Sequence, residues 1–168
     1  MFLALGLQLL VIYAGLGWAA PLRRVLFILS YLILFLFVAA NWRRLGIAVI
    51  GAGLLLNFLA IAANGGLMPI SPETMVRAGL ADRLAGLEPG DPVPFSKDIL
   101  LGGDDTRLRA LSDILVLDNP ADIRAFSVGD TVIAAGLIVT LAELFLPRPR
   151  RSSSLPRGNA PTPPPPGR

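Results

Sequence analysis

The chain has 168 residues, of which 54% are hydrophobic and 16% are charged, with a net charge of +3 and neither cysteine nor histidine. Soluble domains are about a quarter charged, so this composition excludes an ordinary soluble domain and predicts an all-α integral membrane protein. The missing residue types exclude disulfides, thiol chemistry, imidazole catalysis and the usual zinc sites. We expect no cofactor, no metal ion and no nucleic-acid partner.

Four apolar segments predict four transmembrane helices, at about residues 3–20, 25–40, 45–63 and 128–146. At about 1.5 Å per residue, each is near the length that crosses a hydrocarbon core of about 30 Å. The first segment also resembles a signal peptide, but it lacks a preceding basic stretch, so we favour a membrane span. Pro21 with Arg23 and Arg24 predicts a break before the second helix.

The third apolar segment carries small and polar residues on one helical face, namely Gly46, Gly53, Asn57, Ala60 and Asn64. Residues that recur three, four or seven positions apart share a face. Small residues let the backbones of neighbouring helices approach, and amides hydrogen-bond across the contact. We interpret the stripe as a helix–helix contact. A polar lining for a ligand or an ion path, built on the two asparagines, is the alternative.

The third helix is predicted to end at Asn64, because glycines are unfavourable in a helix and Pro69 cannot donate a backbone hydrogen bond. Glycine just after a helix end commonly adopts the left-handed conformation. That role explains Gly65 and Gly66. It does not explain Met68 and Pro69, which stay candidate motif residues.

Residues 64–127, here called the polar segment, carry more acidic than basic side chains. Ser71 followed by Pro72 is typical of a helix start. An apolar stripe follows it, made of Met75, Val76, Leu80, Leu84 and Leu87. A second short helix is predicted after a cap at residues 104–106, with Leu108, Leu111 and Leu115 on one face. The segment has few large apolar residues, so we expect these helices to lie on the bundle or on the membrane surface.

The last apolar segment opens with Ser127-Val128-Gly129-Asp130. A serine followed three residues later by an acid resembles a capping box, and the start of a helix favours the negative charge of Asp130. Further along, Gly136, Thr140 and Glu143 share one helical face. Residues 147–168 form a basic, proline-rich tail that we expect to be disordered.

The placement of arginines predicts the orientation in the membrane. Four spans put both termini on one side, together with Arg43, Arg44 and the arginines of the tail. Positive loops favour the cytoplasm. We therefore expect a bacterial plasma-membrane protein with both termini in the cytoplasm and the polar segment facing outward.

Several motifs follow one another in an order that is typical of one family: Asn64-Gly65-Gly66-Leu67-Met68-Pro69-Ile70-Ser71, Lys97, Asp105-Thr106-Arg107-Leu108, Leu111, Asp113-Ile114 and Ser127-Val128-Gly129-Asp130. Over most of residues 25–146 the chain resembles the bacterial domain-of-unknown-function family 5317, a group of small multi-pass membrane proteins. The resemblance implies a membrane location and a helical architecture, without an agreed activity. Similar chains have a further N-terminal helix and a basic loop, so we expect a shortened chain or a misplaced start. They also commonly have a polar residue in place of Leu67.

We expect polar groups to converge where the polar segment meets the outer membrane face: Lys97, Asp113, Asp130, Asn64 and the amides of Gly65 and Gly66. In particular, docking of the polar segment should bring Asn64 near Asp130. A carboxylate base, a cation and an amide nest would suit a lipid head-group reaction. No nucleophile–base pair or metal-ligand spacing accompanies them, so an enzyme is not favoured.

The sequence therefore favours a structural, sensing or assembly component of the membrane. Its expected partners are the lipid bilayer and other membrane proteins or a second copy of the chain. A small transporter or channel subunit is one alternative, although no charged residue lies deep in a predicted span. A lipid head-group enzyme at the outer face is the other.

Overall fold

The computed structural model describes Gly6, residues 20–117 and residues 125–145, and within them the chain is mostly helical. The three long helices are α2 (Ala20–Asn41), α3 (Leu45–Ala63) and α5 (Val128–Phe145). Each contains a stretch that is long and apolar enough to cross a membrane. The expected span at about residues 3–20 and the tail at residues 147–168 lie outside the described residues, apart from Gly6 and Ala20.

The bounds of α3 are those that the sequence predicts for the third span. α2 starts earlier than the expected second span, because Arg23 and Arg24 are helical. The break predicted at these two arginines is wrong. Arginine is a good helix former, and a proline such as Pro21 is tolerated near a helix start, where its missing N–H has no helical partner.

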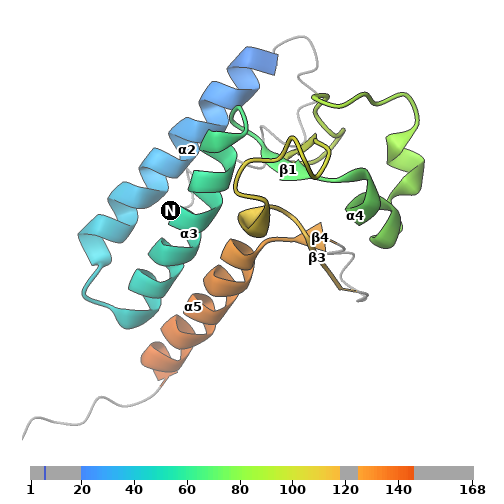
Figure 1. Ribbon diagram of the computed structural model, residues 1–168. Helices are drawn as coiled ribbons and strands as arrows, with labels where there is room; N and C mark the ends of the chain where they lie inside the picture. The colour runs from blue at the N-terminus through green and yellow to red at the C-terminus, as the bar shows by residue number, and fades with distance from the viewer. Residues whose placement is uncertain (1–5, 7–19, 118–124, 146–168) are drawn as a thin grey trace, which may run out of the picture.

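α3 packs against α5 through Gly46, Gly53 and Asn57 of the predicted stripe, and every residue of the stripe is buried. A Cβ atom built on Gly53 would lie 2.6 Å from the Gly129 carbonyl oxygen, and one on Gly46 would lie 2.5 Å from the Thr140 nitrogen. The two backbones therefore approach so closely that only glycine fits at these positions. The helix–helix contact is confirmed, and Figure 1 shows α5 lying alongside α3.

The opposite side of α3 meets α2 through large aromatic side chains. The ring centroids of Tyr31 and Phe58 are 5.8 Å apart, and those of Phe35 and Phe58 are 5.5 Å apart. Phe27 packs edge-on against Tyr31. These rings belong to the main apolar core, and aromatic pairs of this geometry contribute about 0.5–1.5 kcal/mol each beyond their burial.

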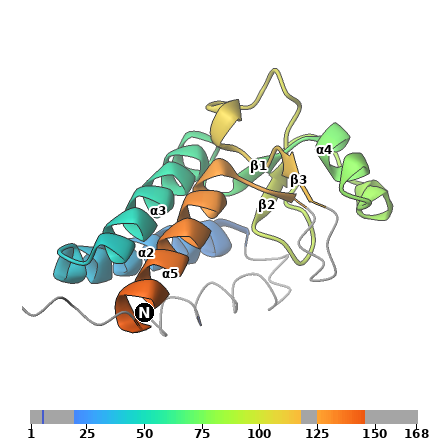
Figure 2. The same cartoon turned by 90° about the horizontal axis from the view of Figure 1, so that it is seen from below.

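α5 is displaced along α3, so the two helices do not start and end at the same level. The first turn of α5 lies against Gly53 and Asn57, whereas α3 continues to Ala63. The seven residues from Asn57 to Asn64 correspond to about 10 Å along the helix axis. The polar segment fills the resulting step at this end of the helices (Figure 2).

The polar segment contains short β-strands that the sequence analysis did not predict, so the all-α expectation is incomplete. Strand β1 (Met68–Ile70) pairs in parallel with β2 (Asp98–Leu100), with Met68 opposite Asp98. Strand β3 (Leu115–Val116) pairs antiparallel with β4 (Ala125–Phe126). Met68 and Pro69, which a helix end did not explain, are therefore the first two residues of a buried strand.

The crossover between β1 and β2 contains α4 (Pro72–Arg77) and a 3₁₀ turn, η2 (Ala81–Leu84). The predicted helix start is confirmed, since the Thr74 N–H donates to the Ser71 hydroxyl at 3.2 Å. The helix ends earlier than the apolar stripe suggests, because Gly79 has a left-handed backbone with φ of 69°. As a result Val76 is exposed, while Met75 joins a small core with Ile70, Val93 and Leu100.

The second short helix predicted after residues 104–106 is wrong. Only a 3₁₀ turn, η3 (Arg109–Leu111), forms there. Leu108 has a left-handed backbone and is exposed, and Leu115 belongs to β3. The Thr106 hydroxyl donates to the Gly102 carbonyl instead of capping a helix. The three leucines therefore share no face.

Candidate functional site

The start of α5 is held by a reciprocal pair of capping hydrogen bonds. The Asp130 N–H donates to the Ser127 hydroxyl at 3.0 Å, and the Ser127 N–H donates to the Asp130 carboxylate at 3.1 Å. This is the capping box that the sequence predicts. Both donors would otherwise lack a partner at the helix start.

Asn57 connects this cap to α3. Its amide NH₂ donates to Asp130 Oδ1 at 2.7 Å, and its carbonyl oxygen accepts from the Ser127 hydroxyl at 2.7 Å. Gly129 allows the approach, because a Cβ atom there would lie only 2.0 Å from the Asn57 Oδ1 atom. Asn57, Ser127, Gly129 and Asp130 therefore form one contact between two membrane-length helices.

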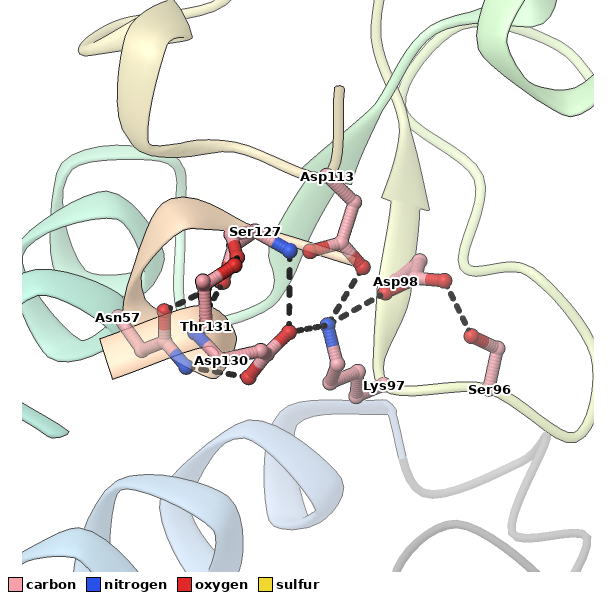
Figure 3. A network of polar contacts seen from close by, with 8 residues as sticks. All are labelled: Asn57, Ser96, Lys97, Asp98, Asp113, Ser127, Asp130 and Thr131. Atoms are coloured by element: carbon pink, nitrogen blue, oxygen red, sulfur yellow. Dashed lines mark hydrogen bonds and ion pairs between the residues drawn. The ribbon is translucent and has the colours of Figure 1, made fainter. Parts of the chain in front are cut away.

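Asp130 also belongs to a charged group that we call the Lys97 cluster, made of Lys97, Asp98, Asp113 and Asp130. The Lys97 ammonium lies 2.5 Å from Asp113 Oδ2, 3.5 Å from Asp98 Oδ1 and 3.8 Å from Asp130 Oδ2. The second oxygen of Asp98 accepts a hydrogen bond from the Ser96 hydroxyl. Figure 3 shows the ammonium surrounded by the three carboxylates.

Strand β1 positions two members of the cluster from its two sides. The Met68 N–H donates to the Lys97 carbonyl at 3.1 Å, and the Asp113 N–H donates to the Pro69 carbonyl at 3.1 Å. Pro69 has no N–H to donate, and its carbonyl supplies the bond that holds Asp113. Met68 and Pro69 are thus positioning residues for Lys97 and Asp113.

The cluster is electrostatically unbalanced, with three carboxylates around one ammonium. Burial raises the pKa of Asp113 to about 7, although the Lys97 ammonium opposes the shift. Burial by itself would lower the pKa of Lys97, but the carboxylates of Asp113, Asp98 and Asp130 outweigh it and raise that pKa, so the lysine stays charged. The Asp113 side chain is 1% exposed, and its Oδ1 atom has no hydrogen-bond partner in the described structure.

Asn64 does not take part in this cluster, so the expected approach of Asn64 to Asp130 is wrong. Its amide NH₂ donates to the carbonyls of Ala60 and Arg107, and its Oδ1 accepts from the Arg107 N–H at 2.9 Å. Asp130 instead meets Asn57, two helical turns earlier, because α5 is displaced along α3. Asn64 connects the polar segment to the end of α3.

Gly65 and Gly66 end α3 as predicted, with φ of 79° and 94°. The Gly66 N–H donates to the Ile61 carbonyl at 2.8 Å, a bond that closes the last helical turn. This N–H is therefore not available for an anion. The expected amide nest beside Lys97 is not formed by Gly66.

Among the described residues, the two serine hydroxyls next to the cluster are already engaged in hydrogen bonds. The Ser127 hydroxyl is bonded to Asn57 and to the cap, and the Ser96 hydroxyl is bonded to Asp98. Within the described residues, no group of three or more acidic, histidine or cysteine side chains is arranged to hold a metal ion. The arrangement provides ion pairing.

Sequence reasoning placed Lys97, Asp113 and Asp130 together, and the structure brings them together. It overlooked Asp98 as a member of the cluster. The only sequence signal for Asp98 is its position directly after Lys97. It also overlooked Tyr31 of α2, a buried residue that interacts electrostatically with Lys97, Asp113 and Asp130. No local pattern marks Tyr31, because its neighbours in space come from distant parts of the chain.

In the described part of the chain, three helices long and apolar enough to cross a membrane suggest a small helical membrane protein. A comparison with protein families matches residues 1–142 to a family of unknown function (DUF5317). The chain belongs to this family, and the match includes all residues of the Lys97 cluster. Searches of curated proteins and of solved structures find no match.

Proposed function

We propose that the protein is a non-catalytic, multi-pass component of the bacterial plasma membrane with a structural, sensing or assembly role. Its helices carry the polar segment as a rigid platform at the outer face, with both termini in the cytoplasm. The positive-inside bias supports this orientation through Arg43, Arg44 and the arginines of the tail.

The observation that carries the proposal is the way in which Lys97 connects separate elements. The ammonium contacts a carboxylate of β2, one beside β1 and one in the first turn of α5. Removing either partner of such a buried pair leaves a charge without compensation, which is strongly unfavourable. The cluster therefore favours one arrangement of the polar segment on the helices, as a platform for assembly requires.

Among the exposed apolar side chains of the platform, Phe95 and Leu108 have a left-handed backbone, with φ angles of 54° and 53°. A left-handed conformation costs a non-glycine residue about 1–2 kcal/mol, so the surrounding structure must hold both residues in it. We assign these residues to the surface that meets a membrane partner.

Photo-crosslinking from single cysteines tests this role, since the chain has no other cysteine. A benzophenone attached at Phe95→Cys or Leu108→Cys in native membranes should give a protein adduct of discrete size, and Lys97→Met should abolish it. The matched control is Ala81→Cys, an exposed site on η2. Lipid adducts alone, or equal protein adducts at all three positions, would exclude an assembly role for this surface.

The orientation has its own test with the same cysteine at Ala81. It should react with an impermeant thiol reagent in intact cells, whereas Ser153→Cys in the tail should react only after permeabilisation. The reverse pattern would overturn the orientation.

A transporter or channel subunit is a second candidate, favoured by the depth of the charges. The Lys97 cluster lies beside Asn57, about 10 Å before the end of a helix of membrane length. Ionisable groups at such a depth commonly mark an ion or proton path. Purified protein in liposomes should then move protons or alkali cations, and tight liposomes would count against this candidate. A lipid head-group enzyme has less support, because the Lys97 charge is already engaged by carboxylates.

A further inference from the structure

The Lys97 cluster contains one ammonium and three carboxylates, so its acidic groups outnumber its basic group. Asp113 is faced by Lys97, by Asp98 of β2, by Asp130 of α5 and by Tyr31 of α2, while α3 contributes the neutral Asn57. If all three carboxylates were ionised, one ammonium would leave two negative charges uncompensated. Excess charge is costly in a buried site of low dielectric constant.

The geometry identifies the carboxylate that should be neutralised. Asp113 is the least exposed of the three, with 1% of its side chain accessible, against 11% for Asp98 and 32% for Asp130. Its Oδ2 atom accepts from Lys97, whereas its Oδ1 atom is buried without a hydrogen-bond partner among the described residues. Asp98 Oδ1 also lacks a hydrogen bond, but it lies 3.5 Å from the Lys97 ammonium and its side chain is more exposed. An ionised oxygen in that position would lose its hydration without replacement, and a protonated carboxyl avoids most of this cost.

We propose that the Lys97 cluster is a proton-binding site in which the buried Asp113 carboxylate takes up and releases a proton. The reaction is Asp113–COO⁻ plus H⁺ giving Asp113–COOH, and it needs no other reactant. Lys97 and Asp130 are 27% and 32% exposed and adjoin Asp113, so they form the route by which the proton exchanges with the outside. The biological meaning of the site rests on the proposed sensing role, with the proton as the signal.

The electrostatics place the exchange near neutrality, since burial raises the pKa of Asp113 to about 7. The unfolded chain would bind the same proton with a pKa of about 3.9. Between these values the folded state holds more protons than the unfolded state. The free energy of unfolding should therefore fall as pH rises from about 4 to about 7, the reverse of the behaviour of a carboxylate in a favourable salt bridge.

Infrared spectroscopy of the full-length protein in lipid nanodiscs tests the proposal directly. Titration from about pH 9 to about pH 5 should reveal the C=O band of a protonated carboxyl, with a midpoint near 7. Asp113→Asn should remove this band. Asp82→Asn, at an exposed aspartate on η2, should leave it unchanged.

A second measurement keeps the test decisive if Asp113→Asn fails to fold. The thermal midpoint of the wild-type protein should fall as pH rises through this range and should not respond to sodium or potassium at constant pH. A band that is absent from the wild type or retained in Asp113→Asn would overturn the proposal. A thermal midpoint that follows sodium instead of pH would also overturn it. The infrared titration tests proton binding, and crosslinking at Phe95 tests the assembly role. Failure of one proposal can therefore be told apart from failure of the other.

Discussion

The contact between α3 and α5 has two halves: one is formed by glycines, and the other by polar and charged side chains. Away from the polar segment, Gly46, Gly53 and Gly136 bring the two backbones together, and the Thr140 hydroxyl beside Gly46 is bonded within α5, to the Gly136 carbonyl. At the other end, Asn57 and Asp130 form hydrogen bonds that lead to Lys97. The second half depends on the first through geometry, because the close backbone approach at Gly53 and Gly129 brings Asn57 within reach of the α5 cap.

The comparison teaches that small residues and charges have complementary roles in this protein. Glycines set the distance between the helices, since any side chain would separate them. The polar groups set their register, since Asn57 can satisfy Ser127 and Asp130 together at only one position along the helix. Substitutions in either half should therefore have distinguishable effects.

The largest effect is expected from Lys97→Met. It leaves three carboxylates without their cation, and breaking a buried pair in this way costs about 3–5 kcal/mol of unfolding free energy. The loss should be smaller at about pH 5, where Asp113 is protonated. Chemical unfolding in detergent measures it, with Arg83→Met, at an exposed site, as the control. Equal stability of the two variants would contradict the role of Lys97.

The glycine half is tested by comparing Gly53→Ala with Gly51→Ala on the same helix. The new methyl at Gly53 meets the backbone of α5, whereas the one at Gly51 meets a single side chain, Val38, and a small shift of α2 relieves that contact. Gly53→Ala should cost about 1–3 kcal/mol or more, and Gly51→Ala less than about 1 kcal/mol. Thermal unfolding of both variants gives the answer. A larger loss at Gly51 would mean that α2, not α5, limits the packing of α3.

The polar half is tested by a double-mutant cycle. Asn57→Ala should cost about 1–3 kcal/mol, because Asp130 Oδ1 and the Ser127 hydroxyl lose their partner. Combined with Asp130→Ala, it should show a coupling energy of about 0.5–3 kcal/mol. Asn64→Ala with Asp130→Ala should instead be additive, because Asn64 bonds to Arg107. Coupling at Asn64 and not at Asn57 would contradict the register of the two helices.

The smallest effect is expected at the cap of α4, away from the contact between α3 and α5. Ser71→Ala removes the acceptor for the Thr74 N–H and should cost about 1 kcal/mol. Ser71→Asp keeps an acceptor and should be nearly neutral. Hydrogen exchange of the α4 amides is the readout. If amides at the contact between α3 and α5 also lost protection from exchange, the polar segment and the helices would unfold as one unit.

Local patterns in the sequence were sufficient for much of the helical structure. The bounds of α3 follow from its apolar length and from the glycines after it. The cap at Ser71 follows from the proline directly after it, and the cap at Ser127 follows from the acid three positions on. All of these features depend on interactions within about one helical turn, so the sequence order displays them directly.

The failures in the polar segment share one physical cause. The second predicted helix was wrong because Leu108 adopts a left-handed conformation that its surroundings impose. The β1–β2 pairing joins residues about thirty positions apart, and three-residue strands carry too little alternation to be recognised. Neither feature has a local signal.

The sequence by itself determined that the chain forms helices long and apolar enough to cross a membrane, with small-residue helix contacts and capped helix ends. It also indicated that Lys97, Asp113 and Asp130 would converge. Only the tertiary structure decided that Asn57, and not Asn64, meets Asp130, since that choice depends on how far α5 is displaced along α3. It also decided that Asp113 is buried with one oxygen unpaired. Helix register and burial arise from contacts between distant parts of the chain, and no short spacing in the sequence encodes them.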